Sequence, residues 1–176
     1  MSEYELLRSE MMDNQKTITQ YELTLYTAVS ALIAFALGKQ EYYYCLIPYV
    51  AIIPLYLLAE AKRQSICDIA AYLSVFCEGE TINWEKRHQK IEAQTRAKRN
   101  WRSTFLYYFI AVVCSGTAIF KLFISGYAPL AMWIRVAILL VFTIIVLAFL
   151  KANTINYVEL RKKRIKQWTK LKEQEE

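Results

Sequence analysis

Four stretches of the chain are apolar at nearly every position, for longer than a helix of a soluble protein allows. They are Leu23–Gly38, Tyr42–Ala59, Ser103–Phe120 (extending to Ile124 past Lys121) and Leu130–Leu150. The last is 21 residues long and carries one charge, Arg135. At about 1.5 Å of rise per residue, this helix covers roughly 30 Å, the thickness of a bilayer's hydrocarbon core. The pattern predicts an all-α integral membrane protein with four transmembrane helices.

The polar segments that flank these spans are expected to extend them as helices. Apolar residues form a heptad-like stripe from Tyr4 to Leu25, interrupted by Asn14, and an amphipathic face runs from Ile66 to Phe76. Because neither Pro nor Gly occurs between Glu3 and Gly38, the first helix is expected to enter its span without a break. Four parts are predicted: 1–60, an N-terminal helix and first transmembrane hairpin; 61–102, a cytoplasmic helical segment that Gly79 breaks and Thr81 restarts; 103–150, a second hairpin; and 151–176, a basic tail helix.

The second span contains Pro48 and Pro54, which predict a kinked helix from Tyr42 onward. Each proline frees a backbone carbonyl that needs a partner inside a membrane. Tyr42, Tyr49 and Tyr56, at heptad spacing, are candidates to supply hydroxyl donors. The kink is either a packing solution or a gating hinge.

The distribution of Lys and Arg orients the spans. The tight linkers Gly38–Glu41 and Ser125–Pro129 contain one such residue, Lys39, whereas 61–102 contains nine and the tail from Lys151 contains eight. By the positive-inside rule, both termini and 61–102 are expected in the cytoplasm. The formal net charge of +6 is therefore first a signal of topology. The acidic N-terminal segment does not resemble a cleavable signal peptide.

The sequence lacks the residue patterns that redox, haem, phosphate-binding and proton-coupled membrane proteins need. The four cysteines form no C-x-x-C pair, the single histidine, His88, lies outside the spans, and the four glycines form no phosphate loop. A proton-coupled exporter needs a carboxylate near mid-membrane, but Glu22, Glu41 and Glu60 lie at span ends, where water is expected to reach them. We therefore expect no enzyme, no catalytic residue, no cofactor and no metal.

Two spans carry stripes of small and polar residues at alternating spacings of three and four. The first stripe is Thr17, Gln20, Thr24, Thr27, Ala31, Ala34 and Gly38, and the second is Ser103, Tyr107, Ala111, Cys114, Ala118, Lys121 and Ser125. Small residues let helix backbones approach closely, and hydroxyls bond across such contacts. The stripes indicate either packing within one chain or a water-filled space between subunits, with Thr24 and Thr27 as candidate pore or interface residues.

Lys121 and Arg135 lie at comparable depths near the outer side. One interpretation is that their long side chains reach the headgroups. The other is that Arg135 faces an aqueous path, where a ring of subunits forms a cationic collar that sets ion preference.

The tail contains the basic run RKKRIKQW, from Arg161 to Trp168. Its first four residues, Arg161, Lys162, Lys163 and Arg164, are candidate contacts for anionic lipid, RNA or an acidic partner. Membrane anchoring is the simplest interpretation, and direct binding of nucleic acid stays open.

The segments YELLRSEMM, LYTAVSALIAFALG, YYYCLIPYVAIIPLYLL, AAYLSVFCE and INWEKR resemble a set of small bacterial membrane proteins. These share an N-terminal helix, a tight first hairpin, a Y-(I/L)-x-V-F-x-E stretch (here Tyr72–Glu78) and a following N-W-E (Asn83–Glu85). The likeness covers about half of the chain and implies a bacterial inner membrane.

Size and layout also resemble the membrane accessory family of type VI-B CRISPR systems. That resemblance implies a ring-shaped pore that supports antiviral immunity led by an RNA-guided ribonuclease, and thus a cytosolic ribonucleoprotein partner. The family is described as a diverged HEPN fold, whose ribonucleases need an Arg and, with four to six residues between them, a His, here His88. Residues 81–83 at those positions are Thr, Ile and Asn, so no catalytic role carries over.

Two functions follow as hypotheses. The first is a homo-oligomeric pore or membrane-perturbing effector, which requires a ring of subunits and a polar lumen. The alternative is a non-conducting scaffold that recruits a cytosolic partner through an exposed face.

Overall fold

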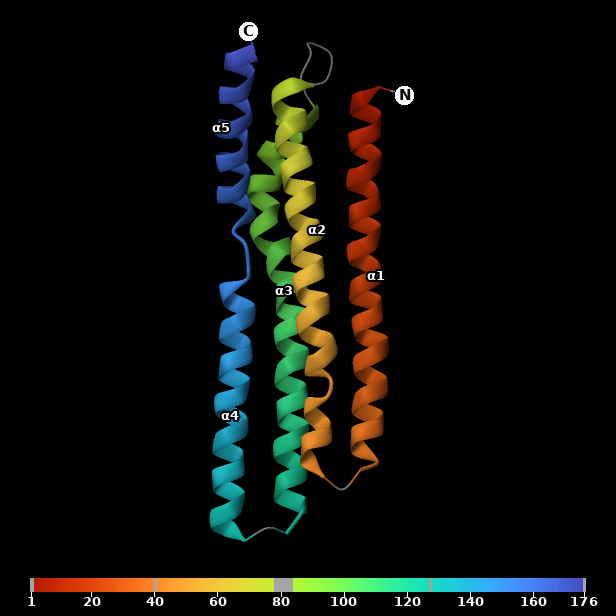
Figure 1. Cartoon of the computed structure of the whole chain (residues 1–176), viewed down its shortest axis with the longest axis vertical. Coiled ribbons are helices and arrows are strands. Elements are labelled where there is room, and N and C mark those ends of the chain that lie inside the picture. The colour runs from red at the N-terminus through yellow and green to blue at the C-terminus, as the bar shows by residue number, and fades with distance from the viewer. Residues whose placement is uncertain (1, 40, 78–83, 127, 176) are drawn as a thin grey trace. The chain divides into compact units, whose positions relative to one another are not determined.

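The computed structural model describes the backbone of residues 2–39, 41–77, 84–126 and 128–175, and their side chains except for 84–103 and 175. Within these residues all regular structure is helical (Figure 1). The elements are α1 (Glu3–Leu37), the 3₁₀ helix η1 (Tyr42–Leu46), α2 (Tyr49–Phe76), α3 (Trp84–Ile124), α4 (Pro129–Ala152) and α5 (Tyr157–Glu175). Four stretches are long and apolar enough to cross a membrane, in Glu3–Leu37, Tyr42–Phe76, Thr104–Ile124 and Pro129–Gln174. The predictions of an all-α chain and of four candidate spans are confirmed.

The chain divides into two compact units, each made of segments that are distant in sequence. The span unit consists of Tyr21–Leu58 and Ser103–Thr154 and contains the most apolar part of each candidate span. The polar unit consists of Met1–Gln20, Ala59–Arg102 and Ile155–Glu176. The boundaries between the units fall inside or next to the long helices, so α1, α2 and α3 contribute to both.

The first helix is unbroken, as its sequence predicts. Its N-terminus is closed by a reciprocal pair of hydrogen bonds: the Glu5 amide donates to Ser2 Oγ (3.3 Å) and the Ser2 amide donates to Glu5 Oε2 (3.0 Å). This capping box satisfies two donors that have no partner within the helix. The helix ends at Leu37, directly before Gly38.

The prediction of one kinked helix from Tyr42 is wrong, because the chain forms two helices there. Residues 42–46 form η1, and the α-helix α2 begins at Tyr49, after Pro48. Proline has no N–H to donate to a carbonyl four residues earlier, so an α-helix cannot run through this position with its ladder intact. The Pro48 carbonyl instead accepts the amide of Ile52 (3.0 Å) and starts α2. Pro54 does lie inside α2.

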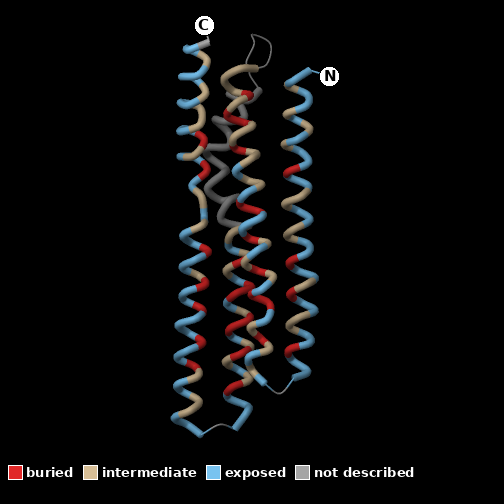
Figure 2. The backbone as a smooth tube through the Cα atoms, in the orientation of Figure 1, coloured by how far each residue is buried: buried red, intermediate tan, exposed pale blue. Residues whose placement is uncertain are grey.

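The span unit has a well-packed core made by α1 to α4. One buried cluster joins Leu25 and Val29 of α1 with residues of the other three helices, and a second lies around Ala36, Cys45 and Leu122. In Figure 2, α1 carries few buried positions. The most apolar window of α1 is only 17% buried within the chain, against 39% for the windows of α2 and α3. The first span therefore leaves most of its surface free of contact with its own chain.

Candidate functional site

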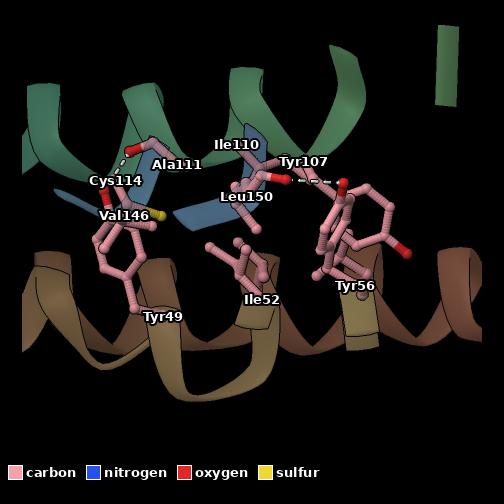
Figure 3. Close-up of a cluster of buried hydrophobic side chains, with 11 residues drawn as sticks. Tyr49, Ile52, Tyr56, Tyr107, Ile110, Ala111, Cys114, Val146 and Leu150 are labelled. Atoms are coloured by element: carbon pink, nitrogen blue, oxygen red, sulfur yellow. Dashed lines mark hydrogen bonds between the residues drawn. The ribbon is translucent and has the colours of Figure 1, made fainter. Parts of the chain in front are cut away.

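The interior of the span unit is filled by large side chains. Figure 3 shows Tyr49, Ile52 and Tyr56 of α2 meeting a row of α3 residues, with Val146 and Leu150 of α4 between them. Tyr56 and Tyr107 are fully buried, and their rings pack edge to face with centroids 5.1 Å apart. Side chains fill this part of the bundle axis. A pore through a single chain requires a water-filled path at the same place.

Buried hydroxyls join the helices of this core. The Tyr49 hydroxyl lies 2.6 Å from the Ala111 carbonyl and 2.6 Å from Ser115 Oγ, which is itself 2.6 Å from Thr143 Oγ1. The Tyr56 hydroxyl donates to the Leu150 carbonyl at 3.0 Å. Both tyrosines thus bond to backbone carbonyls of other helices, Tyr49 to α3 and Tyr56 to α4. Such interhelical bonds stabilise membrane bundles by about 0.6–2 kcal/mol each.

The two small-residue stripes differ in burial. On α3, the stripe is buried within the chain at Tyr107, Ala111, Cys114 and Ala118, so the interpretation as packing within one chain is confirmed for these residues. The side chain of Ser103 lies outside the described residues. Sequence spacing alone does not distinguish this stripe from the one on α1.

On α1, the stripe lies on the exposed face. Thr24, Thr27, Ala31 and Ala34 are exposed, whereas Leu25, Val29 and Ala36 make the contact with the rest of the unit. Packing within one chain is therefore the wrong interpretation for this stripe. Within the described side chains of the four apolar stretches predicted from sequence (Leu23–Gly38, Tyr42–Ala59, Ser103–Ile124 and Leu130–Leu150), the exposed Ser and Thr residues are Thr24, Thr27 and Ser30, all on α1. We call Thr24, Thr27, Ser30, Ala31 and Ala34 the outer face of α1.

Lys121 of α3 caps the end of α1. Its ammonium donates to the carbonyls of Ala36, Leu37 (3.1 Å) and Lys39. The last carbonyls of a helix have no partner within the helix and carry the negative end of its dipole, so a cation there is stabilising. The structure thus places the Lys121 ammonium in a contact within the chain.

Lys121→Met should loosen the end of α1 and little else, because methionine keeps the length of the side chain and removes its donors. We expect a loss of about 1–3 kcal/mol in the local opening free energy, since buried or partly buried carbonyls lose charge-assisted bonds. Hydrogen exchange of the Gly38 and Lys39 amides should become faster. Lys151→Met, at an exposed position on α4, is the matched control, and equal exchange in both variants would refute the capping role.

Arg135 of α4 also has a partner within the chain. Its guanidinium carbon lies 5.8 Å from the centroid of the Tyr42 ring, and the side chain is half-buried. A cation in this position is attracted by the negative face of the ring. Arg135 of α4 therefore contacts η1 through the Tyr42 ring. It is not one of the residues of the outer face of α1.

In the polar unit, the basic run of the tail is divided between two faces of α5. Arg161 is 7% exposed, and Arg164 Nε lies 2.8 Å from Asp68 Oδ1 as an ion pair whose N–H is not aligned for a hydrogen bond. Lys162 and Lys163 are exposed, together with Lys166 and Lys170. Further contacts of α5 with α2 join Trp168 to Tyr72 and Phe76, and Lys172 Nζ to the Val75 carbonyl (3.3 Å). Arg161 and Arg164 thus hold the tail in place, and the lysines face solvent.

The expectation that water reaches Glu60 is wrong. This carboxylate is 3% exposed and accepts hydrogen bonds from Arg63 (2.6 Å) and from the Tyr157 hydroxyl of α5. The charge is tolerated because it is paired and hydrogen-bonded. No local pattern reveals this contact, since Tyr157 lies 97 residues further along the chain.

Asn14 interrupts the apolar stripe of α1 for a structural reason. It is 5% exposed, its amide donates to Ser65 Oγ (3.2 Å), and its carbonyl accepts Lys62 Nζ (3.0 Å). A satisfied buried amide fixes the register between two helices, because any slip leaves it without partners.

Among the described residues, no three His, Cys, Asp or Glu side chains come together as a metal site. The side chain of His88 and the expected helix break at Gly79 and Thr81 lie outside those residues. Compared with family models, curated proteins and solved structures, the chain matches none.

Proposed function

We propose that this chain is a homo-oligomeric membrane pore whose aqueous path runs between copies and is bordered by the outer face of α1. The observation that carries this proposal is the exposure of Thr24 and Thr27, opposite the face by which α1 contacts its own chain. Hydroxyls and small side chains tolerate water and let helices approach.

The other surfaces of the span unit support lipid contact. Most exposed side chains of α4 are large and apolar, including Ile134, Ile138, Val141 and Ile144. The interior is filled by the core around Tyr56 and Tyr107. A path between copies along α1 therefore requires the least change to the packing of a single chain. Planar-bilayer conductance of the purified protein tests the proposal, because a scaffold passes no current.

The protein is proposed to lie in a bacterial inner membrane with both termini and 61–102 in the cytoplasm, as the count of basic residues favours. A cysteine at Ser125, in the exposed turn after α3, should then react with an impermeant maleimide added outside spheroplasts. A cysteine at Lys170, exposed on α5, should react only after permeabilisation. The opposite result would reverse the topology.

The native cysteines should interfere little with this labelling. Three are buried, and burial together with the nearby Glu3 carboxylate raises the pKa of the half-buried Cys77 thiol. Because thiolate is the reactive form, labelling of Cys77 should be slow at neutral pH and accelerate as the pH rises toward its raised pKa. Cys77→Ser supplies the background for both engineered cysteines.

We further propose a role in antiviral defence, with a cytosolic ribonucleoprotein as partner, on the strength of the resemblance described above. The alternative function is a scaffold that holds such a partner at the membrane. The exposed lysines Lys162 and Lys163 favour it, since they are available to an anionic partner while Arg161 and Arg164 are engaged with the chain itself.

A further inference from the structure

Three cations gather at the end of the span unit where α1 stops, and their side chains differ in what they contact. Lys121 Nζ donates to three carbonyls at the end of α1, one of them that of Lys39. Arg135 is half-buried over the Tyr42 ring. Lys39 is exposed and directly continues α1. It is therefore the cation of this group that follows most directly after α1, the helix that carries the outer face.

The backbone of Lys39 is held by hydrogen bonds at both its amide and its carbonyl. Its amide donates to the Ala36 carbonyl (3.1 Å), and its own carbonyl accepts the ammonium of Lys121. Its side-chain nitrogen lies 5.0 Å above the ring of Phe35, one turn earlier on α1. The Phe35 ring is half exposed and is itself held edge-on against Tyr44, with centroids 5.9 Å apart. The charge of Lys39 is thus held beside the last turn of α1, while one side of it is open.

We infer that Lys39 is the residue that selects ions, and that it selects for small anions such as chloride. This inference rests on the proposed pore. A path along the outer face of α1 ends beside Lys39, and a ring of copies repeats its charge around the mouth. Rings of charged side chains set the ion preference of a pore. One of the two sequence-based interpretations gives this role to Arg135, whose guanidinium lies over the Tyr42 ring.

One carboxylate stands close in sequence and opposes this effect. Glu41 is exposed and begins the approach to η1. Together with Lys39, Lys121 and Arg135 it leaves an excess of two positive charges among these four residues. The excess has the sign that attracts anions.

The test is the reversal potential of the purified protein in planar bilayers under a KCl gradient, for the wild type and three variants. Lys39→Gln should lower the chloride-to-potassium permeability ratio about 25-fold, because one unit charge about 4 Å from an ion in water favours chloride about fivefold and disfavours potassium about fivefold. Lys39→Glu should lower it further and reverse the preference to potassium. Arg135→Gln removes the same charge at the site packed on Tyr42 and should change the ratio less than Lys39→Gln does. The mass of each purified variant in detergent is measured as well, so that only variants that assemble like the wild type are compared.

Two results overturn the inference while the pore stands: a ratio that Lys39→Glu leaves unchanged, or a ratio that Arg135→Gln lowers as much as Lys39→Gln. A wild type that passes no current overturns the proposed function, and the inference with it. The two failures are thus distinguished by whether the wild-type protein conducts.

Discussion

Glu60→Ala is expected to lower the free energy of unfolding by about 3–5 kcal/mol, the usual cost of removing one partner of a buried ion pair. The carboxylate is 3% exposed and accepts bonds from Arg63 and Tyr157. Its loss removes the buried acceptor of Arg63 and a contact that joins α5 to α2. Denaturant unfolding of the purified protein in detergent, followed by the fluorescence of its four tryptophans, measures the effect.

Two further variants separate the buried charge from a general effect of removing a carboxylate. Glu60→Gln keeps the size and the acceptor for Tyr157 but loses the charge, so its unfolding free energy should fall between those of the wild type and Glu60→Ala. Glu10→Ala removes an exposed carboxylate from α1 and should change stability by less than about 0.5 kcal/mol. Equal unfolding free energies of Glu60→Ala and Glu10→Ala would show that the contacts of Glu60 with Arg63 and Tyr157 contribute nothing to stability.

The double variant Thr24→Leu/Thr27→Leu is expected to reduce conductance roughly tenfold or more while assembly persists. Two hydroxyls, each making bonds worth about 0.5–1.5 kcal/mol, are replaced by apolar bulk, and every 1.4 kcal/mol is a factor of ten. A hydrophobic constriction closes a narrow path by excluding water. Single-channel current and detergent-extracted mass are measured on the same preparation.

Gly116→Leu is the matched control, because it adds the same kind of apolar bulk to an exposed position of α3. A Cβ at Gly116 meets no atom within 4 Å, so the leucine has room within its own chain. It should conduct like the wild type. If both variants conduct normally, or both lose current, the outer face of α1 does not border the path.

The sequence predicts what depends on local periodicity and composition. The unbroken α1, the extent of α4 and the number of candidate spans all follow from runs of apolar residues and from the positions of Pro and Gly. The start of α2 does not follow from the sequence in this way: a proline within an apolar run predicts a bent helix, whereas the chain ends one helix before Pro48 and begins another after it.

The contacts of the candidate site depend instead on which helices are neighbours. Spacing shows that Thr24 and Thr27 share a face, as Ala111 and Cys114 do, but it does not show that one face is exposed and the other buried. The capping of α1 by Lys121 joins residues more than eighty positions apart. The position of Glu60 at the end of an apolar run predicts that it is exposed to solvent. Its burial is explained by the contact with Tyr157 of α5, which the sequence does not reveal.

Planar-bilayer conductance of the purified wild-type protein, with its mass in detergent determined on the same sample, tests the central claim most directly. The account predicts a complex of several copies that produces discrete steps of current. A monomer that inserts into the bilayer and passes no current, in the presence or absence of cytosolic extract, would contradict it and favour the scaffold.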